Sequence, residues 1–221
     1  MASVLGGTTL CPMLTLDYAN CLEHRVGPHG LDAAVLGAGG EYAAAIVAHT
    51  KSLARTRGTG WERWRNLPLP PVRDEHVKAV RGVVGACKGK FDTMVVLGIG
   101  GSALGNIALQ SALNPPTYNL LADSQRPGPR MFVVDNVDPA SFAPVLEFCR
   151  TQPGGLSRTL FNVVSKSGET AETAAQFMVI REMLQKALGA RFAGNIVAIT
   201  DPAKGTMRQI CTRDGYATLP V

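Results

Sequence analysis

The sequence has little of what secreted, metal-binding or membrane proteins carry. Its five cysteines are an odd number without C-x-x-C spacing, which indicates neither a disulfide framework nor a zinc site. No apolar run approaches the roughly 20 residues of a membrane span, and the N-terminus lacks the pattern of a secretory signal. These absences predict a reduced, soluble, cytoplasmic protein with no metal site and no membrane partner.

Charge of one sign is not in large excess either. The sequence has 22 lysines and arginines against 17 aspartates and glutamates. This balance suits an acidic small molecule and is too even to indicate a nucleic-acid partner. With 46% apolar residues in a chain of 221, the protein has enough material for a hydrophobic core.

The pattern along the chain changes near residue 71. Residues 1–71 have helical spacing at 31–36 and 41–53, which predicts an N-terminal helical annex. From 72 to 221, short apolar runs alternate with longer segments of helical spacing, which predicts a second domain. Strands are predicted at 94–97, 131–134, 160–164, 195–199 and 216–221, and helices at 72–88, 102–113, 140–150, 169–188 and 206–212. The fold class is therefore α/β, with a doubly wound, flavodoxin-like sheet of five parallel strands.

Two turns rich in glycine and hydroxyl groups each follow a predicted strand and open a predicted helix. They are Gly98-Ile99-Gly100-Gly101-Ser102 and Ser165-Lys166-Ser167-Gly168-Glu169-Thr170. The first amides of a helix lack internal partners, and the aligned peptide dipoles place partial positive charge there. Glycines let the backbone approach a ligand closely, and hydroxyls add donors. Together the turns predict a phosphate-binding site.

The first turn alone permits another interpretation. Gly98, Gly100 and Ala103 satisfy the dinucleotide-binding fingerprint, whose glycines approach a pyrophosphate. A dinucleotide site also needs an acidic residue about 20 residues further on, and the candidate Asp135 lies well beyond that distance. This distance disfavours a dinucleotide site, and a dinucleotide-dependent oxidoreductase remains as a further alternative that predicts NAD binding.

The motifs resemble the two sugar-phosphate signatures of the phosphoglucose isomerase (glucose-6-phosphate isomerase) family. The similar stretches are GIGGSALG at 98–105 and SKSGETAET at 165–173, and the resemblance spans roughly residues 70–221. It implies a sugar isomerase (SIS) domain that interconverts glucose 6-phosphate and fructose 6-phosphate in glycolysis and gluconeogenesis. It further implies that the reaction needs no cofactor and that the complete enzyme is a homodimer.

Carried over by motif, the resemblance assigns the substrate phosphate to both turns. Its ligands would be Gly101 and Ser102 from the first turn and Ser165, Lys166, Ser167, Gly168, Glu169 and Thr170 from the second. Glu169 stands where the family often has a hydroxyl, so its side chain is expected to point away from the dianion.

No catalytic residue is assigned in this chain. The family's glutamate, arginine, lysine and histidine all lie, by resemblance, beyond the point matching Val221, so the isolated chain is predicted to bind the sugar phosphate without isomerising it. We therefore expect the N-terminal, phosphate-binding portion of an isomerase. The alternative is a stand-alone SIS module that binds a sugar phosphate for regulation.

Overall fold

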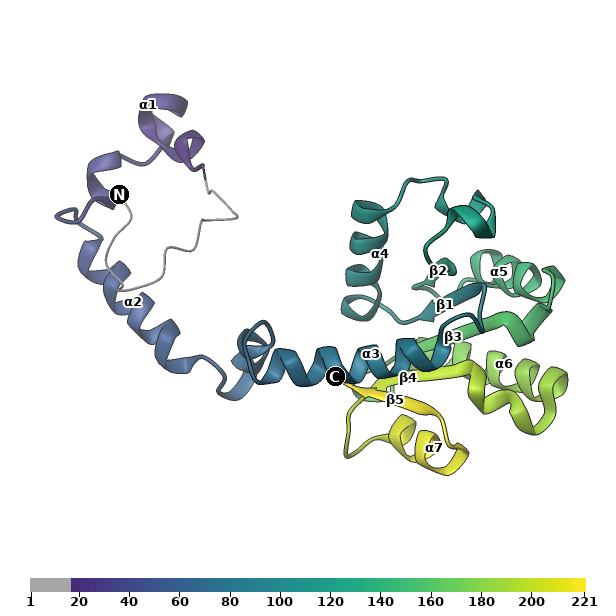
Figure 1. Ribbon diagram of the computed structural model, residues 1–221. Helices are drawn as coiled ribbons and strands as arrows, with labels where there is room; N and C mark the ends of the chain where they lie inside the picture. The colour runs from purple at the N-terminus through teal and green to yellow at the C-terminus, as the bar shows by residue number, and fades with distance from the viewer. Residues whose placement is uncertain (1–16) are drawn as a thin grey trace. The chain divides into compact units, whose positions relative to one another are not determined.

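The chain divides into two units, Met1–Arg73 and Asp74–Val221, close to the boundary predicted after Pro71. The computed structural model describes residues 17–221 (Figure 1). Helix α3 (Val72–Cys87) begins in the first unit and continues into the second.

Residues 17–73 of the first unit form helices and 3-10 turns. These elements include α1 (Glu23–Val26), α2 (Ala43–Thr56) and several 3-10 turns, one of them at Ala33–Leu36. The spacing at 41–53 thus predicts α2, whereas 31–36 yields only a 3-10 helix. Among residues 17–73 only Leu22 is buried, so the described part of this unit has almost no core of its own.

The second unit is built on one five-stranded parallel sheet. The strands are β1 (Thr93–Leu97), β2 (Arg130–Val134), β3 (Thr159–Val164), β4 (Ile196–Thr200) and β5 (Ala217–Pro220). The connecting helices are α4 (Gly101–Leu113), α5 (Pro139–Thr151), α6 (Ala171–Leu188) and α7 (Thr206–Asp214). The spatial order is β2-β1-β3-β4-β5, with every pairing parallel, which confirms the predicted fold class (Figure 1).

The direction of the crossovers changes between β1 and β3. The connection through α4 runs from β1 outward to β2, while α5, α6 and α7 carry the chain the opposite way along the sheet. Because such crossovers are right-handed, α4 lies on one face of the sheet and the other three helices on the opposite face. The topological switch point therefore lies between the neighbouring strands β1 and β3. At such a point α/β sheets bind ligands beyond the carboxyl ends of the strands.

The main core lies between the sheet and helices α5, α6 and α7. Val95 and Phe161 from the two central strands are fully buried there against Ile180 and Leu184 of α6. Branched and aromatic side chains favour strands, and alternate residues reach the same face, which explains why these short runs form the centre of the sheet. The core thus fixes the strands on either side of the switch point.

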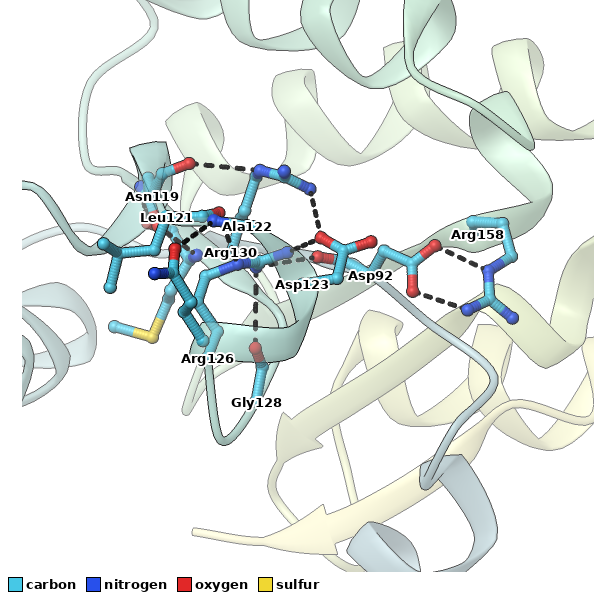
Figure 2. Close-up of polar contacts among 11 residues, drawn as sticks. Asp92, Asn119, Leu121, Ala122, Asp123, Arg126, Gly128, Arg130 and Arg158 are labelled. Carbon is cyan, nitrogen blue, oxygen red and sulfur yellow. Dashed lines mark hydrogen bonds and ion pairs between the residues drawn. The ribbon is translucent and has the colours of Figure 1, made fainter.

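The amino ends of the strands are held by a network of paired charges (Figure 2). Asp92, just before β1, accepts two hydrogen bonds from the Arg158 guanidinium, at 2.7 Å to Nε and 2.5 Å to Nη2. These bonds are the main reason that the pKa of Asp92 lies below its ordinary value. Nearby, the buried Arg126 side chain pairs with Asp123 and also donates to the Leu121 carbonyl at 3.2 Å. The carboxylates at this edge of the sheet are thus paired with arginines of the same network.

Candidate functional site

The two turns singled out by the sequence lie side by side at the carboxyl edge of the sheet. Strands β1 and β3 are neighbours in parallel register, with Leu97 opposite Val163. The chain leaves both strands at the same level, and each turn then opens a helix, α4 or α6. The structure therefore brings the predicted segments together at the switch point.

Gly98 lets the first turn pack closely against the end of β3. A Cβ at this position would lie 2.9 Å from the Ser102 Cβ and 3.2 Å from the Val164 carbonyl oxygen. Real Cβ atoms almost never approach other atoms this closely, so a side chain here would push the start of α4 away from the end of β3. The absence of a side chain at Gly98 sets the spacing of the site.

The first turn offers backbone amides and one hydroxyl at the start of α4. The Ser102 amide donates to the Ile99 carbonyl at 3.1 Å, and the Ala103 amide donates to the Gly100 carbonyl at 3.0 Å. In the described chain no side chain caps the start of α4. The exposed Gly101 amide and the half-buried Ser102 hydroxyl are thus the groups positioned to meet an anion.

The hydroxyls of the second turn organise its backbone. Ser165 Oγ accepts from the Gly168 amide at 3.1 Å, and Ser167 Oγ accepts from the Glu169 amide at 3.2 Å. A serine hydroxyl carries one hydrogen and two lone pairs, so each oxygen that accepts from the backbone can also donate, and Ser165 donates to Thr170 Oγ1. Ser165 Oγ lies 3.4 Å from Thr170 Oγ1, which links the two ends of the turn.

The residues of the second turn differ in exposure. Ser165 and Thr173 are buried, at 3% and 1% exposure, so neither hydroxyl opens directly to solvent. Lys166, Ser167 and Glu169 are exposed, and Thr170 is half-buried. The hydroxyls therefore form an inner, buried pair, Ser165 and Thr173, and an outer, more exposed pair, Ser167 and Thr170.

Helix α6 begins at this turn with its first amides uncapped by any described side chain. Thr170 is the residue before the helix, and its carbonyl accepts from the Ala174 amide at 2.9 Å. The amides of the first turn, starting at Ala171, lie at the positive end of an 18-residue helix. This end of α6 favours a negatively charged ligand.

Sequence reasoning missed a contact between α6 and the loop after β2. The buried Gln176 side chain donates to the Asn136 carbonyl at 2.8 Å. Asp135, the acidic residue considered for a dinucleotide, follows β2 directly and is exposed. A glutamine within a helical pattern carries no signal of this bond, because its partner lies 40 positions away.

The described residues also bear on two other features, a metal-binding cluster and a membrane-spanning helix. Among residues 17–221, no cluster of three or more histidine, cysteine, aspartate or glutamate side chains is placed to hold a metal ion. Within the same part of the chain, none of the helices has the length and apolarity that a membrane crossing requires.

Comparison with known proteins gives a consistent result. The family model for phosphoglucose isomerase matches residues 73–209, which include both turns. A glucose-6-phosphate isomerase of Rubrobacter xylanophilus is 44% identical over 210 residues, covering 94% of this chain and 44% of that protein. One from Carboxydothermus hydrogenoformans is 39% identical over 153 residues, covering 69% of this chain and 32% of that protein. The chain thus spans less than half the length of these relatives.

Solved structures show the same likeness. A Thermus thermophilus protein described as hypothetical superposes with a TM-score of 0.65 at 30% identity, covering 81% of this chain and 39% of that one. A glucose-6-phosphate isomerase from Chlamydia trachomatis superposes with a TM-score of 0.51 at 32% identity, covering 68% of this chain and 26% of that one.

Proposed function

Because the chain belongs to the phosphoglucose isomerase family, we propose that its two turns bind the phosphate group of glucose 6-phosphate or fructose 6-phosphate. The observation that carries the proposal is that the two turns leave neighbouring parallel strands at the same level of the switch point, with Gly98 of the first turn packed against the end of β3. A phosphate dianion there gains from two helix dipoles and from charge-assisted hydrogen bonds to Ser102, Ser167 and Thr170.

Calorimetric titration of residues 1–221 tests this proposal against the dinucleotide alternative. Glucose 6-phosphate is expected to bind, and glucose without the phosphate is expected to bind far more weakly, because the phosphate supplies most of the polar contacts. NAD serves as the competing ligand. Binding of NAD together with no response to glucose 6-phosphate would refute the proposal.

Single hydroxyl deletions test the assigned residues. Thr170→Ala is expected to weaken binding of glucose 6-phosphate by about 1 to 2 kcal/mol, or roughly 5- to 30-fold, for one lost hydrogen bond in a charged site. Ser165→Ala is expected to weaken it by a similar amount indirectly, because it removes the bonds that hold the Gly168 amide and Thr170 Oγ1 in place. Thr212→Ala is the matched control, because its exposed hydroxyl donates only to the Arg208 carbonyl within α7. Unchanged affinity in both site variants would argue against the cradle.

We also propose that residues 1–221 provide phosphate binding and no acid–base group for the aldose–ketose interconversion. Isomerisation needs a base within about 3 Å of the proton that it removes. A coupled assay of the 221-residue polypeptide is therefore expected to show no turnover, with the full-length Rubrobacter xylanophilus relative as the positive control. Turnover at a rate comparable to that control would overturn this part of the proposal.

A further inference from the structure

The second turn rests against the loop between β4 and α7, which neither the motifs nor the comparisons single out. The hydrogen-bond ladder between β3 and β4 continues into the turn. The Ser165 amide donates to the Ile199 carbonyl at 3.0 Å, and the Asp201 amide donates to the Lys166 carbonyl at 3.2 Å. The first two residues of the turn are therefore anchored to β4 and to the residue that follows it.

Two glycines with positive φ form the next part of the contact. Gly205 has a φ of 94°, and a Cβ there would overlap the Ser167 carbonyl oxygen. Gly168 has a φ of 71°, and a Cβ there would lie 2.8 Å from both the amide nitrogen and the Cβ of Met207. Each segment thus carries a glycine at the point where the other backbone approaches, which leaves no space between them for a side chain.

Asp201 fixes the shape of this loop. Its carboxylate oxygen Oδ1 accepts from the Ala203 amide at 2.8 Å and from the Lys204 amide at 3.0 Å. Its carbonyl accepts from the Arg208 guanidinium at 3.1 Å, and the same guanidinium donates to Thr218 Oγ1 at 3.2 Å. The loop is therefore held from within and is tied to α7 and β5.

We propose that the loop Asp201–Gly205 is a positioning element for phosphate binding, which acts through the backbone of Ser167 and Gly168. The inference rests on the proposed function of the second turn. Ser167 Oγ already accepts from the Glu169 amide, so a shift of the Ser167 backbone moves an outward-facing hydroxyl and the start of α6 together. Sites that bind by several directed hydrogen bonds lose affinity when their supporting residues move by a fraction of an ångström.

The test compares glycine substitutions at the two ends of α7. Gly205→Ala places a methyl group against Ser167. Gly215→Ala is the matched control: Gly215 also has a positive φ, 75°, but a Cβ there meets nothing within 4 Å. Both variants strain the backbone near α7, and only the first disturbs the turn. Affinity for glucose 6-phosphate and for inorganic phosphate is measured by calorimetry on the whole 221-residue chain, beside the melting temperature.

We expect Gly205→Ala to weaken binding of both probes by at least about tenfold, and Gly215→Ala to lower the melting temperature while leaving affinity unchanged. Equal affinity in Gly205→Ala and the parent chain would overturn the positioning role alone. Equal loss in both variants would overturn it as well, because the effect would then follow stability. A parent chain that binds neither probe would overturn both this inference and the proposed function.

A second pair of variants covers the case in which Gly205→Ala fails to fold. Asp201→Ala removes the acceptor of two loop amides, whereas Asp201→Asn keeps an oxygen in that place. The alanine variant is expected to bind glucose 6-phosphate several-fold more weakly, with most of the affinity restored in the asparagine variant. Similar affinity in parent, alanine and asparagine variants would contradict the positioning role.

Discussion

Gly98→Ala is expected to weaken binding of glucose 6-phosphate by at least about tenfold. The added Cβ would lie 2.9 Å from the Ser102 Cβ and 3.2 Å from the Val164 carbonyl oxygen. Relief of this overlap moves the start of α4 away from β3 and separates the two groups of phosphate donors. Calorimetry measures the change directly.

Gly105→Ala, in the helix α4 that follows the first turn, is the matched control. A Cβ at Gly105 meets nothing within 4 Å, and alanine favours a helix interior over glycine by about 1 kcal/mol. This variant is expected to melt slightly higher than the parent chain and to bind with the same affinity. If Gly98→Ala binds as tightly as the parent, the close packing of the first turn against the end of β3 does not control phosphate binding.

Asp214→Ala is expected to cause the largest loss of stability, about 2 kcal/mol in the free energy of unfolding. Its carboxylate accepts from Arg181 at 2.9 Å and from the Tyr216 hydroxyl at 3.0 Å, and Arg213 donates to it at 2.7 Å. Its removal leaves the buried Tyr216 hydroxyl without this acceptor and the half-buried Arg181 without its counter-charge. A drop in melting temperature of roughly 4 to 8 °C follows.

The effect of Asp214 is also expected to depend on pH. Its pKa lies well below the ordinary value, chiefly because of the hydrogen bond from Arg213 and then those from Arg181 and Tyr216, whereas burial opposes the shift. A carboxylate with a lowered folded-state pKa stabilises the protein above the unfolded pKa of about 3.9, and this contribution falls as pH drops toward the folded value. The stability difference between parent and variant should therefore be constant near neutrality and shrink below about pH 4.

Glu147 provides the control for this experiment. It also accepts two hydrogen bonds from one arginine, Arg150, at 2.9 and 2.8 Å, but both side chains are more than half exposed. Glu147→Ala is expected to leave the melting temperature almost unchanged, because solvent screens an exposed ion pair. Equal losses of stability in Asp214→Ala and Glu147→Ala would show that burial of the ion pair does not determine its contribution to stability.

The elements of the sheet domain follow closely from local sequence. The apolar run at 94–97 corresponds to β1 and that at 160–164 to β3, each to within one residue. Short branched runs separated by helical spacing leave a parallel sheet as the simplest arrangement that buries them. The two turns could be recognised because glycine and hydroxyl residues follow these runs directly.

The inner structure of the site could not be predicted in the same way. Four hydroxyls within nine residues look equivalent in the sequence, yet Ser165 and Thr173 are buried by the packing around the turn. The approach of Gly205 to Ser167 joins segments from different crossovers, and glycine before a helix predicts only the helix start. Such contacts depend on how the strands are ordered, which local spacing does not specify.

Amide chemical shifts during titration with glucose 6-phosphate give the most direct test of phosphate binding at the switch point. We expect the largest changes on Gly101 and Ser102 and on the amides from 165 to 173, and weaker shifts of the same set with inorganic phosphate. Changes confined to one of the two turns, or centred on the amino edge around Asp92 and Arg158, would contradict this expectation.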